Sequence, residues 1–263
     1  MISKILKRLT DESLISEKSS ISSVSEGASI ASLYYIMNVD GNNFYLKIQK
    51  ETEYCNRLLK EKMAYELLNE YLIVPEVIFY EIVGDYEVLC ISELSGNNFE
   101  QLNGFISENE IIRLYAKGLK SIHSLPINIC NVNIKIEDRI KQASYRVENN
   151  QVNYDDFEQE YKKYTPKELL HILVDKKPIK TDLVLTHGDY CFDNLILTKD
   201  NLVGYIDLGN SGIADRYQDI AIAIRSIKHN YGIEYVDLFC AEYGIDRIDY
   251  EKMEFYIILD EFS

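Results

Sequence analysis

The chain lacks tryptophan, contains only four prolines, and has no long hydrophobic run among its 263 residues. A membrane-spanning helix needs about 20 consecutive apolar residues, and no stretch here approaches that length. The first residues, Met1 to Arg8, become charged before the apolar core of a signal peptide could form. We therefore expect no membrane span and no secretion signal, and we expect the protein in the cytoplasm.

Cysteine is also sparse. The five cysteines are widely scattered and include no C-x-x-C pair, which argues against both a disulfide framework and a zinc site. The four histidines include no H-E-x-x-H motif, and no G-x-S-x-G motif suggests a hydrolase nucleophile. These absences favour a reducing compartment and argue against the common zinc-enzyme and serine-hydrolase mechanisms.

Positive charge is scarce as well: 28 lysines and arginines face 43 aspartates and glutamates, which gives a net charge of −15. A surface this acidic repels a phosphate backbone, so nucleic acid is an unfavourable partner and a cationic ligand a favourable one. The hydrophobic content of 46%, with 21 tyrosines and 9 phenylalanines, is too high for a disordered acidic chain. The length fits one large domain or two modest lobes.

The first third of the chain is predicted to form strands and one helix. Strand-like segments rich in aromatic and β-branched residues occur at 33–37, 44–48, 77–80 and 87–91. The first two are joined by a turn at Asp40–Gly41 and form a hairpin. A helical pattern covers 53–71, with Leu59, Met63 and Leu67 on one face. We expect a sheet of about four or five strands and one long helix.

Beyond Ser95 the composition changes to helices. Ser107 and Glu110 form a capping-box pattern ahead of a helix that continues to Ser124. Short apolar runs then predict strands at 183–186, 195–197 and 202–206, and helical patterns return after Arg216. We place a boundary near Ser95, between a lobe of residues 1–95 and a lobe of residues 96–263. The predicted fold class is α+β, with a sheet-plus-helix lobe followed by a larger, mainly helical lobe.

The most informative stretch is Thr-His-Gly-Asp-Tyr-Cys-Phe-Asp-Asn at 186–194, followed by Ile-Asp-Leu-Gly at 206–209. Asp189, Asn194 and Asp207 each lie where a short predicted strand begins or ends, so a tight hairpin could bring them into one cleft. Phosphoryl transfer needs such a set: one carboxylate orients the attacking hydroxyl, while an amide oxygen and a second carboxylate hold Mg²⁺. Taken singly, the three could be ordinary turn residues. His187 is expected to pack and to hydrogen-bond within the loop.

The patterns H-G-D-x-x-x-x-N and I-D-L-G resemble the aminoglycoside phosphotransferase family, whose relatives include the protein kinases. The similarity extends from Ser25–Ser29 to Ile258–Phe262, at a chain length typical of the aminoglycoside 3′-phosphotransferases. The resemblance implies a bilobal protein-kinase-like fold and transfer of the γ-phosphoryl group of ATP to a sugar hydroxyl, which confers antibiotic resistance. It also implies that Asp189 is the catalytic base and that Asn194 and Asp207 bind Mg²⁺.

The resemblance assigns a nucleotide site to the first lobe. Lys47 would reach the α- and β-phosphates of ATP, and Glu61 would be its ion-pair partner. The other implied nucleotide contacts are Ser29 in a phosphate-covering loop, Tyr45 stacking on adenine, and the Ser92 and Leu94 main chain. GTP could replace ATP, because main-chain contacts at 92–94 would carry that choice. The alternatives are a solvated strand-end lysine at 47, an ordinary strand aromatic at 45, and a plain loop at 25–29.

The same resemblance places a polycationic acceptor in the second lobe, against carboxylates. The expected substrate-binding residues are Asp155, Asp156, Asp193, Arg225 and Glu261. The segment 155–160 could instead be a solvated helix face, and Arg225 could pin acidic neighbours together.

The resemblance also implies that Asp219 braces the catalytic loop from below. The chain departs from the family pattern at Asn210, His229, Asn230 and the final Ser263, and this leaves the choice of aminoglycoside and hydroxyl open. Two other functions remain open: a small-metabolite kinase acting on choline, homoserine or a sugar, and a non-catalytic nucleotide-binding module.

Overall fold

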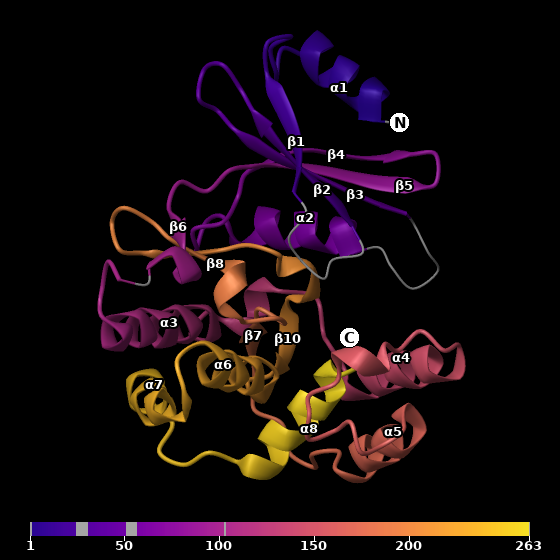
Figure 1. Cartoon of the computed structure of the whole chain (residues 1–263), viewed down its shortest axis with the longest axis vertical. Coiled ribbons are helices and arrows are strands. Elements are labelled where there is room, and N and C mark those ends of the chain that lie inside the picture. Colours follow the sequence, from indigo (N-terminus) through magenta and orange to yellow (C-terminus); the bar gives the residue numbers. More distant parts are fainter. Residues whose placement is uncertain (1, 25–30, 51–56, 103, 263) are drawn as a thin grey trace. The chain divides into compact units, whose positions relative to one another are not determined.

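The structure is a computed structural model, and it describes residues 2–24, 31–50, 57–102 and 104–262. The chain divides into two compact units, shown in Figure 1. The first unit comprises Met1–Gly96 together with Ile196–Asn210, and the second comprises Asn97–Leu195 together with Ser211–Ser263. The division between Gly96 and Asn97 lies next to the expected boundary at Ser95. The segment 196–210, expected in the second lobe, belongs to the first unit.

The first unit is built on a five-stranded antiparallel sheet with the order β1-β2-β3-β5-β4. Its strands are β1 (Ser20–Val24), β2 (Ser32–Met37), β3 (Phe44–Lys50), β4 (Val77–Val83) and β5 (Tyr86–Ser92). The four strands expected from the sequence are all present. The edge strand β1 was missed because its residues, Ser-Ile-Ser-Ser-Val, are mostly exposed and show no apolar alternation.

Alternation along β3 decides which side chains face the two sides of this sheet. Phe44, Leu46 and Ile48 are buried in a hydrophobic cluster with Ile5 and Leu9 of helix α1 (Ile2–Asp11), which covers one face. Successive strand residues point to opposite faces, so Lys47 faces the other side. That side is covered by helix α2 (Arg57–Leu68), as Figure 1 shows.

The buried face of α2 differs from the expected one. The buried residues are Leu58, Glu61, Ala64, Tyr65 and Leu68, whereas Met63 is 50% exposed. The prediction of a Leu59, Met63 and Leu67 face was therefore wrong. Both sets have helical spacing, and leucine pairs at 58–59 and 67–68 make the sequence ambiguous. The structure buries the set that contains the large ring of Tyr65 and that brings Glu61 to Lys47.

A short hairpin completes the first unit. Strands β8 (Leu195–Leu197) and β9 (Val203–Tyr205) pair, and the turn between them contains Asn201 in a left-handed conformation, with φ 56°. Gly204 lies against the chain at Ile73, and a Cβ at this position would come 3.0 Å from Leu94 and 3.3 Å from Ile73. The single-turn helix η5 (Leu208–Asn210) follows and packs against α2.

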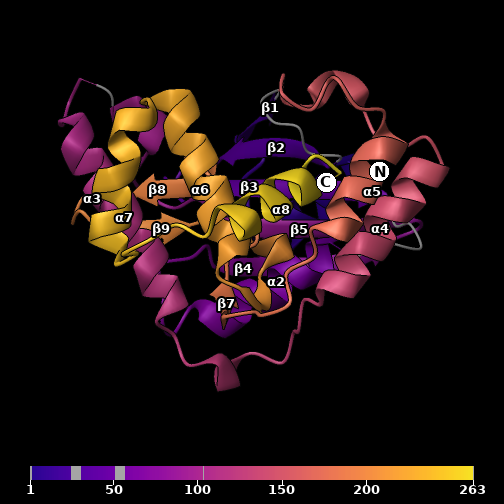
Figure 2. The same ribbon diagram turned by 90° about the horizontal axis from the view of Figure 1, so that it is seen from below.

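The second unit is mainly helical. Helices α3, α6 and α7 gather on one side and α4 and α5 on the other, with α8 between them, in both Figure 1 and Figure 2. Its helices are α3 (Glu108–His123), α4 (Ile136–Glu148), α5 (Pro166–Asp175), α6 (Tyr217–Asn230), α7 (Val236–Tyr243) and α8 (Tyr250–Asp260). The helix expected to begin after Ser107 does so, because the Ser107 hydroxyl accepts the Glu110 N–H.

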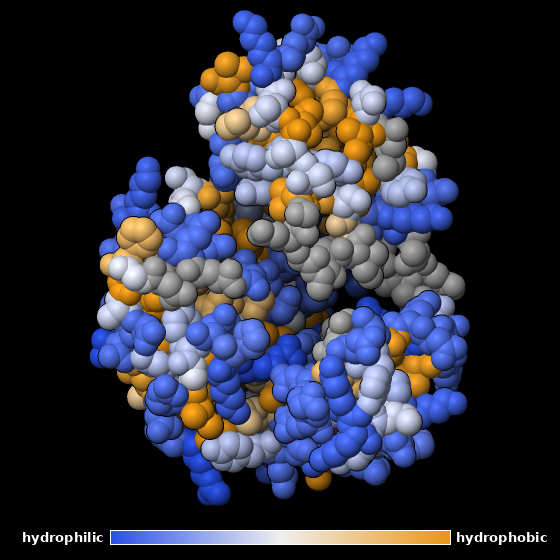
Figure 3. Space-filling view, viewed as in Figure 1, coloured by the Kyte–Doolittle hydropathy of each residue, from blue (hydrophilic) through white to orange (hydrophobic). Residues whose placement is uncertain are grey.

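The remaining elements of the second unit are short. Strand β7 (Leu183–Thr186) pairs antiparallel with β10 (Gly212–Asp215), and the two form a small sheet. The other short elements are β6 (Asn97–Asn98), η1 (Phe99–Leu102), η2 (Ile127–Ile129), η3 (Tyr154–Asp156), η4 (Phe192–Asn194) and η6 (Ile233–Tyr235). In the second unit, hydrophobic residues appear as isolated spots among hydrophilic ones on the face in Figure 3. Within the described ranges, no helix is both long enough and apolar enough to span a bilayer.

Candidate active site

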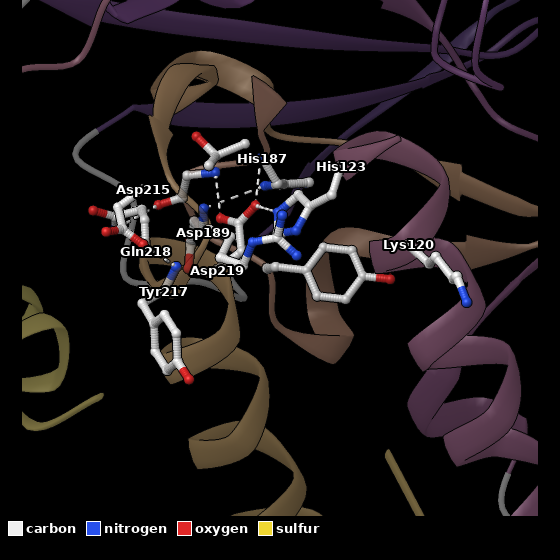
Figure 4. A network of polar contacts seen from close by, with 12 residues as sticks. Lys120, His123, His187, Asp189, Asp215, Tyr217, Gln218 and Asp219 are labelled. Atoms are coloured by element: carbon white, nitrogen blue, oxygen red, sulfur yellow. Dashed lines mark hydrogen bonds and ion pairs between the residues drawn. The ribbon is translucent and has the colours of Figure 1, made fainter. Parts of the chain in front are cut away.

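The loop that follows β7 is held by buried hydrogen bonds to α6. Asp219, in the first turn of α6, accepts the backbone N–H groups of His187 at 2.7 Å and Gly188 at 2.8 Å (Figure 4). Gly188 has φ 91°, a conformation that glycine adopts without strain. The Gln218 side chain also donates to the Gly188 carbonyl, at 3.4 Å. Asp219 therefore braces the loop, as the sequence analysis expected.

Asp189 and Asn194 contact each other within this loop. The Asn194 side-chain nitrogen donates to the Asp189 carbonyl at 2.9 Å and to its carboxylate at 3.0 Å. The Asp189 N–H donates to Nδ1 of His187 at 3.3 Å, and the buried His187 ring contacts the Tyr190 ring. His187 thus has the packing and hydrogen-bonding role that we expected. The half-buried Asp189 carboxylate is held in one orientation by its own loop.

The residue next to Asp189 is tied to α3 by a reciprocal pair of hydrogen bonds. Tyr115 donates to the Tyr190 carbonyl at 2.6 Å, and Tyr190 donates to the Tyr115 carbonyl at 2.7 Å. Both residues are fully buried, and the Tyr115 ring also stacks on Phe192 with 4.0 Å between centroids. The sequence analysis did not single out Tyr115, although its place on the apolar face of the predicted helix was readable. This aromatic packing gives the loop a rigid base.

In the first unit, Lys47 lies between two carboxylates. Its ammonium group is 2.6 Å from Glu61 and 3.3 Å from Asp207, and its side chain is 16% exposed. Burial lowers the pKa of Lys47, but attraction to Glu61 and Asp207 outweighs this effect, so its pKa lies above the ordinary value. Lys47 is not a solvated strand-end lysine. It is a charged group at a fixed position, which is what a phosphate contact requires.

Two further residues complete this cluster, and neither was found from the sequence. The Tyr65 hydroxyl donates to Glu61 at 2.7 Å and accepts the backbone N–H of Asp207 at 2.9 Å. Arg57 forms a longer ion pair with Asp207, at 3.8 Å. Asp207 itself has φ 56°, a left-handed conformation that is uncommon for residues other than glycine. Tyr65 therefore connects the helix that carries Glu61 with the segment that carries Asp207.

The expected adenine contacts lie at the end of β5. The N–H groups of Ser92 and Glu93 donate to the carbonyls of Glu76 at 2.9 Å and Asn43 at 3.0 Å, so both are already engaged. Glu93 accepts from the Tyr35 hydroxyl and from the Asn43 amide. Tyr45 is partly buried, and its ring lies 5.1 Å from that of Tyr35. Ser29 and the loop 25–29 lie outside the described residues.

The expected acceptor residues divide into two groups. Arg225 pairs with Asp260, with Glu158 at 3.6 Å and with Glu261 at 3.7 Å, so it pins acidic neighbours together. The side chain of Glu261 is 3% exposed and accepts the N–H of Glu158 at 2.9 Å. Burial raises the pKa of Glu261 to about 7.

Two of the other acceptor candidates are exposed. Asp155 and Asp193 both face solvent. The side chain of Asp156 lies outside the part of the structure that is described. The segment 155–160 is not a regular helix face, because only the single turn η3 (Tyr154–Asp156) is helical within it.

The donor set fits a hard divalent cation. In the second unit, Asn194 uses its amide nitrogen to hold Asp189, so the atom it could offer a cation is its side-chain oxygen; in the first unit, Asp207 has a carboxylate that is 27% exposed. Oxygen donors of this kind suit Mg²⁺, which commonly takes one or two protein ligands and completes its coordination with water and substrate phosphate. We therefore consider the residues compatible with a nucleotide-bound Mg²⁺.

The fold, the loop that carries Asp189 and the cluster around Lys47 are those of a protein-kinase-like phosphotransferase. Comparisons with known proteins agree. A family model described as the phosphotransferase enzyme family matches residues 20–256. Aminoglycoside 3′-phosphotransferases of Niallia circulans and Enterococcus faecalis are 37% and 34% identical to this chain. The alignments cover 88% of this chain and 87% of the first relative, and 90% of both chains for the second.

A solved structure agrees with the sequence comparisons. The crystal structure of an aminoglycoside 3′-phosphotransferase of type VIII matches with a TM-score of 0.85 and 26% identity, covering 99% of this chain and 98% of that one. The chain therefore belongs to the phosphotransferase enzyme family, and within it is similar to the aminoglycoside 3′-phosphotransferases. The resemblance identified from the sequence motifs is confirmed.

Proposed function

We propose that this protein transfers the γ-phosphoryl group of ATP to the 3′-hydroxyl of an aminoglycoside antibiotic and thereby confers resistance. The observation that carries this proposal is the loop 187–194, in which Asn194 holds the Asp189 carboxylate and Asp219 holds the loop amides. Full-length similarity to aminoglycoside 3′-phosphotransferases supports the substrate class.

Asp189 would accept the proton of the attacking hydroxyl. A positioned general base contributes about 10²- to 10⁴-fold in rate. The hydrogen bond from Asn194 and the loop bonds to Asp219 remove rotational freedom from Asp189, so that its carboxylate does not have to be ordered during the reaction. In this proposal, Asp189 takes a proton from the hydroxyl while that oxygen forms its new bond to the γ-phosphorus, and the bond from that phosphorus to the β–γ bridging oxygen breaks and releases ADP.

The first unit would bind the nucleotide. Lys47 would contact the α- and β-phosphates, and its salt bridge with Glu61 would fix its position. Because the Ser92 and Glu93 N–H groups are engaged, the base would bind through the Ser92 carbonyl and the Leu94 N–H, beside Tyr45. The same two main-chain groups could accept GTP. Mg²⁺, held through Asn194 and Asp207, would neutralise phosphate charge when bound.

The acceptor would bind through its ammonium groups. The candidate carboxylates are Asp155, Asp156, Asp193 and Glu261, and Arg225 orders part of this set through its ion pairs. A single exposed ion pair contributes only about 0.2–1 kcal/mol, so several must act together. The net charge of −15 adds a long-range attraction for a polycation.

A coupled ADP-release assay tests the proposal against its two rivals. The acceptor panel contains kanamycin, choline and homoserine, and NMR of the kanamycin product locates the phosphate. We expect kanamycin-dependent ADP release and phosphate on the 3′-oxygen. Release with choline or homoserine alone would favour a small-metabolite kinase. Nucleotide binding without release for any acceptor would favour a non-catalytic module.

A further inference from the structure

Three helix ends converge beneath the catalytic loop, and they carry buried polar side chains. Helix α3 ends at His123, helix α7 ends at Tyr243, and Asp219 lies in the first turn of α6. The side chains of His123 and Asp219 are 3% and 0% exposed, and Tyr243 is 5% exposed. Figure 4 shows His123 reaching from α3 towards Asp219. Polar groups at this depth have to satisfy their hydrogen bonds within the protein.

Asp219 and Tyr243 contact different ring nitrogens of His123 and together decide which nitrogen carries the proton. Its two oxygens accept the N–H groups of His187 and Gly188, and Oδ2 lies 2.9 Å from Nε2 of His123. An ionised carboxylate only accepts hydrogen bonds, so Nε2 has to be the donor. In a neutral imidazole with the proton on Nε2, the other nitrogen, Nδ1, is an acceptor and requires a donor.

Tyr243 supplies that donor. Its hydroxyl lies 2.7 Å from Nδ1 of His123, and Arg216 donates to the same hydroxyl at 3.4 Å. Arginine can only donate, so the Tyr243 oxygen accepts from Arg216 and its own proton is left for the acceptor Nδ1 of His123. Burial raises the pKa of Tyr243 to about 12, so the phenol keeps its proton at neutral pH. The hydrogen bonds therefore run in one direction, from Arg216 through Tyr243 and His123 to Asp219.

We propose that Tyr243 is a positioning residue whose hydroxyl fixes the Nε2–H tautomer of His123 and thereby holds Asp219 on the catalytic-loop amides. Tyr243 contacts no reacting group, and its effect on Asp189 is transmitted through His123, Asp219 and the loop backbone. It lies at the end of α7, far from the loop in sequence. The effect on catalysis rests on the proposed phosphoryl transfer, whereas the effect on the tautomer and the loop amides does not.

The substitution Tyr243→Phe tests the relay because it removes only the hydroxyl. The ring that stacks on Phe239 with centroids 6.1 Å apart is retained. We expect ¹⁵N NMR of histidine-labelled protein to show His123 protonated on Nε2, and a mixture of tautomers in the variant. Amide hydrogen exchange at His187 and Gly188 should become about threefold to tenfold faster, the effect of one buried hydrogen bond.

Tyr217→Phe is the matched control. Tyr217 is a buried residue whose hydroxyl accepts the N–H of Asp249 at 2.7 Å, so its loss removes one hydrogen bond outside the relay. This variant should leave the His123 tautomer and the exchange at His187 and Gly188 unchanged. Unchanged exchange in Tyr243→Phe overturns the proposal. So does a proton on Nδ1 of His123 in the unmodified protein, a measurement that does not depend on whether the variant folds.

Kinetics provide the functional readout. In an active enzyme, Tyr243→Phe should lower kcat by about the same threefold to tenfold, with the KM for nucleotide and for acceptor unchanged. Tyr217→Phe should retain the unmodified kcat. An unchanged kcat in Tyr243→Phe overturns the link between the relay and catalysis. If the unmodified protein phosphorylates no acceptor, the proposed function fails, and the NMR and exchange data still decide whether the relay exists.

Discussion

At the scale of single residues, the proposed phosphate contact and the proposed base are each held in place by neighbouring side chains. Lys47 lies between Glu61 and Asp207, and Asp189 is held by Asn194. When one partner of a partly buried ion pair is removed, the protein loses more stability than the pair contributes, because the remaining charge is left without compensation. Substitutions at these positions should therefore keep the shape of the side chain, so that the loss of charge is the only change tested.

The first prediction concerns the proposed base. Asp189→Asn keeps the size of the side chain but removes the proton acceptor, so we expect kcat to fall by about 10²- to 10⁴-fold. Nucleotide affinity should stay within about twofold, because Asp189 itself is not among the proposed nucleotide or Mg²⁺ contacts. Steady-state kinetics and ADP titration calorimetry measure both. Asp200→Asn, in the exposed turn between β8 and β9, is the control. Turnover retained in Asp189→Asn would show that the base has been assigned incorrectly.

The second prediction concerns Glu261. Because burial raises its pKa to about 7, the folded protein holds a proton on Glu261 that the unfolded chain releases at lower pH. The stabilisation from this protonated form is present below the ordinary carboxyl pKa of 4.5 and is lost as the pH rises through 7. Glu261→Gln should therefore gain in Tm relative to the unmodified protein between pH 5 and pH 8. A Tm difference that is independent of pH would contradict this.

At the scale of elements, α2 links the sheet to the proposed phosphate contact. It carries Glu61, and Glu87 of β5 accepts a hydrogen bond from the first described turn of this helix. The Glu87 carboxylate is 1% exposed and accepts the Leu59 N–H at 3.2 Å and the Tyr80 hydroxyl at 2.7 Å. A carboxylate at a helix N-terminus also interacts favourably with the helix dipole.

The third prediction follows from this contact. Glu87→Ala removes the carboxylate that accepts a partly buried N–H and a partly buried hydroxyl, so the free energy of unfolding should fall by about 1–3 kcal/mol. Urea unfolding measures the loss. Glu81→Ala in neighbouring β4 is the control, because Glu81 forms a surface ion pair with Arg8 that contributes about 0.2–1 kcal/mol. Equal losses in the two variants would rule out a special role for Glu87.

At the scale of the whole molecule, the charge of −15 acts on both proposed substrates with opposite sign. A polycationic aminoglycoside is attracted over a distance that salt shortens to about 10 Å at 0.1 M ionic strength, whereas anionic ATP is repelled. The fourth prediction is that the acceptor KM rises as NaCl increases from about 20 to 300 mM, a range that spans this screening. The KM for ATP should stay constant or fall. Initial rates with each substrate varied separately test this, and a parallel rise of both would contradict it.

The sequence predicts features that depend on neighbouring residues better than features that depend on residues far apart in the chain. Strands β2 to β5 of the first sheet and the helix after Ser107 were predicted correctly, because alternation and capping are local patterns. The loop motif was also readable, since Asp189 and Asn194 contact each other within one short segment. The roles of these residues in phosphoryl transfer remain predictions.

The sequence alone determined the fold class, the family and the order of the polar residues in the catalytic loop, because these depend on spacing within short segments. Only the tertiary structure decided which stripe of α2 is buried, that Tyr65 joins Glu61 to the Asp207 backbone, and that Tyr243 contacts His123. Those partners are far apart in the chain and lie on helices with more than one usable face. Packing selects among such faces by burying the largest apolar surface while keeping buried polar groups hydrogen-bonded.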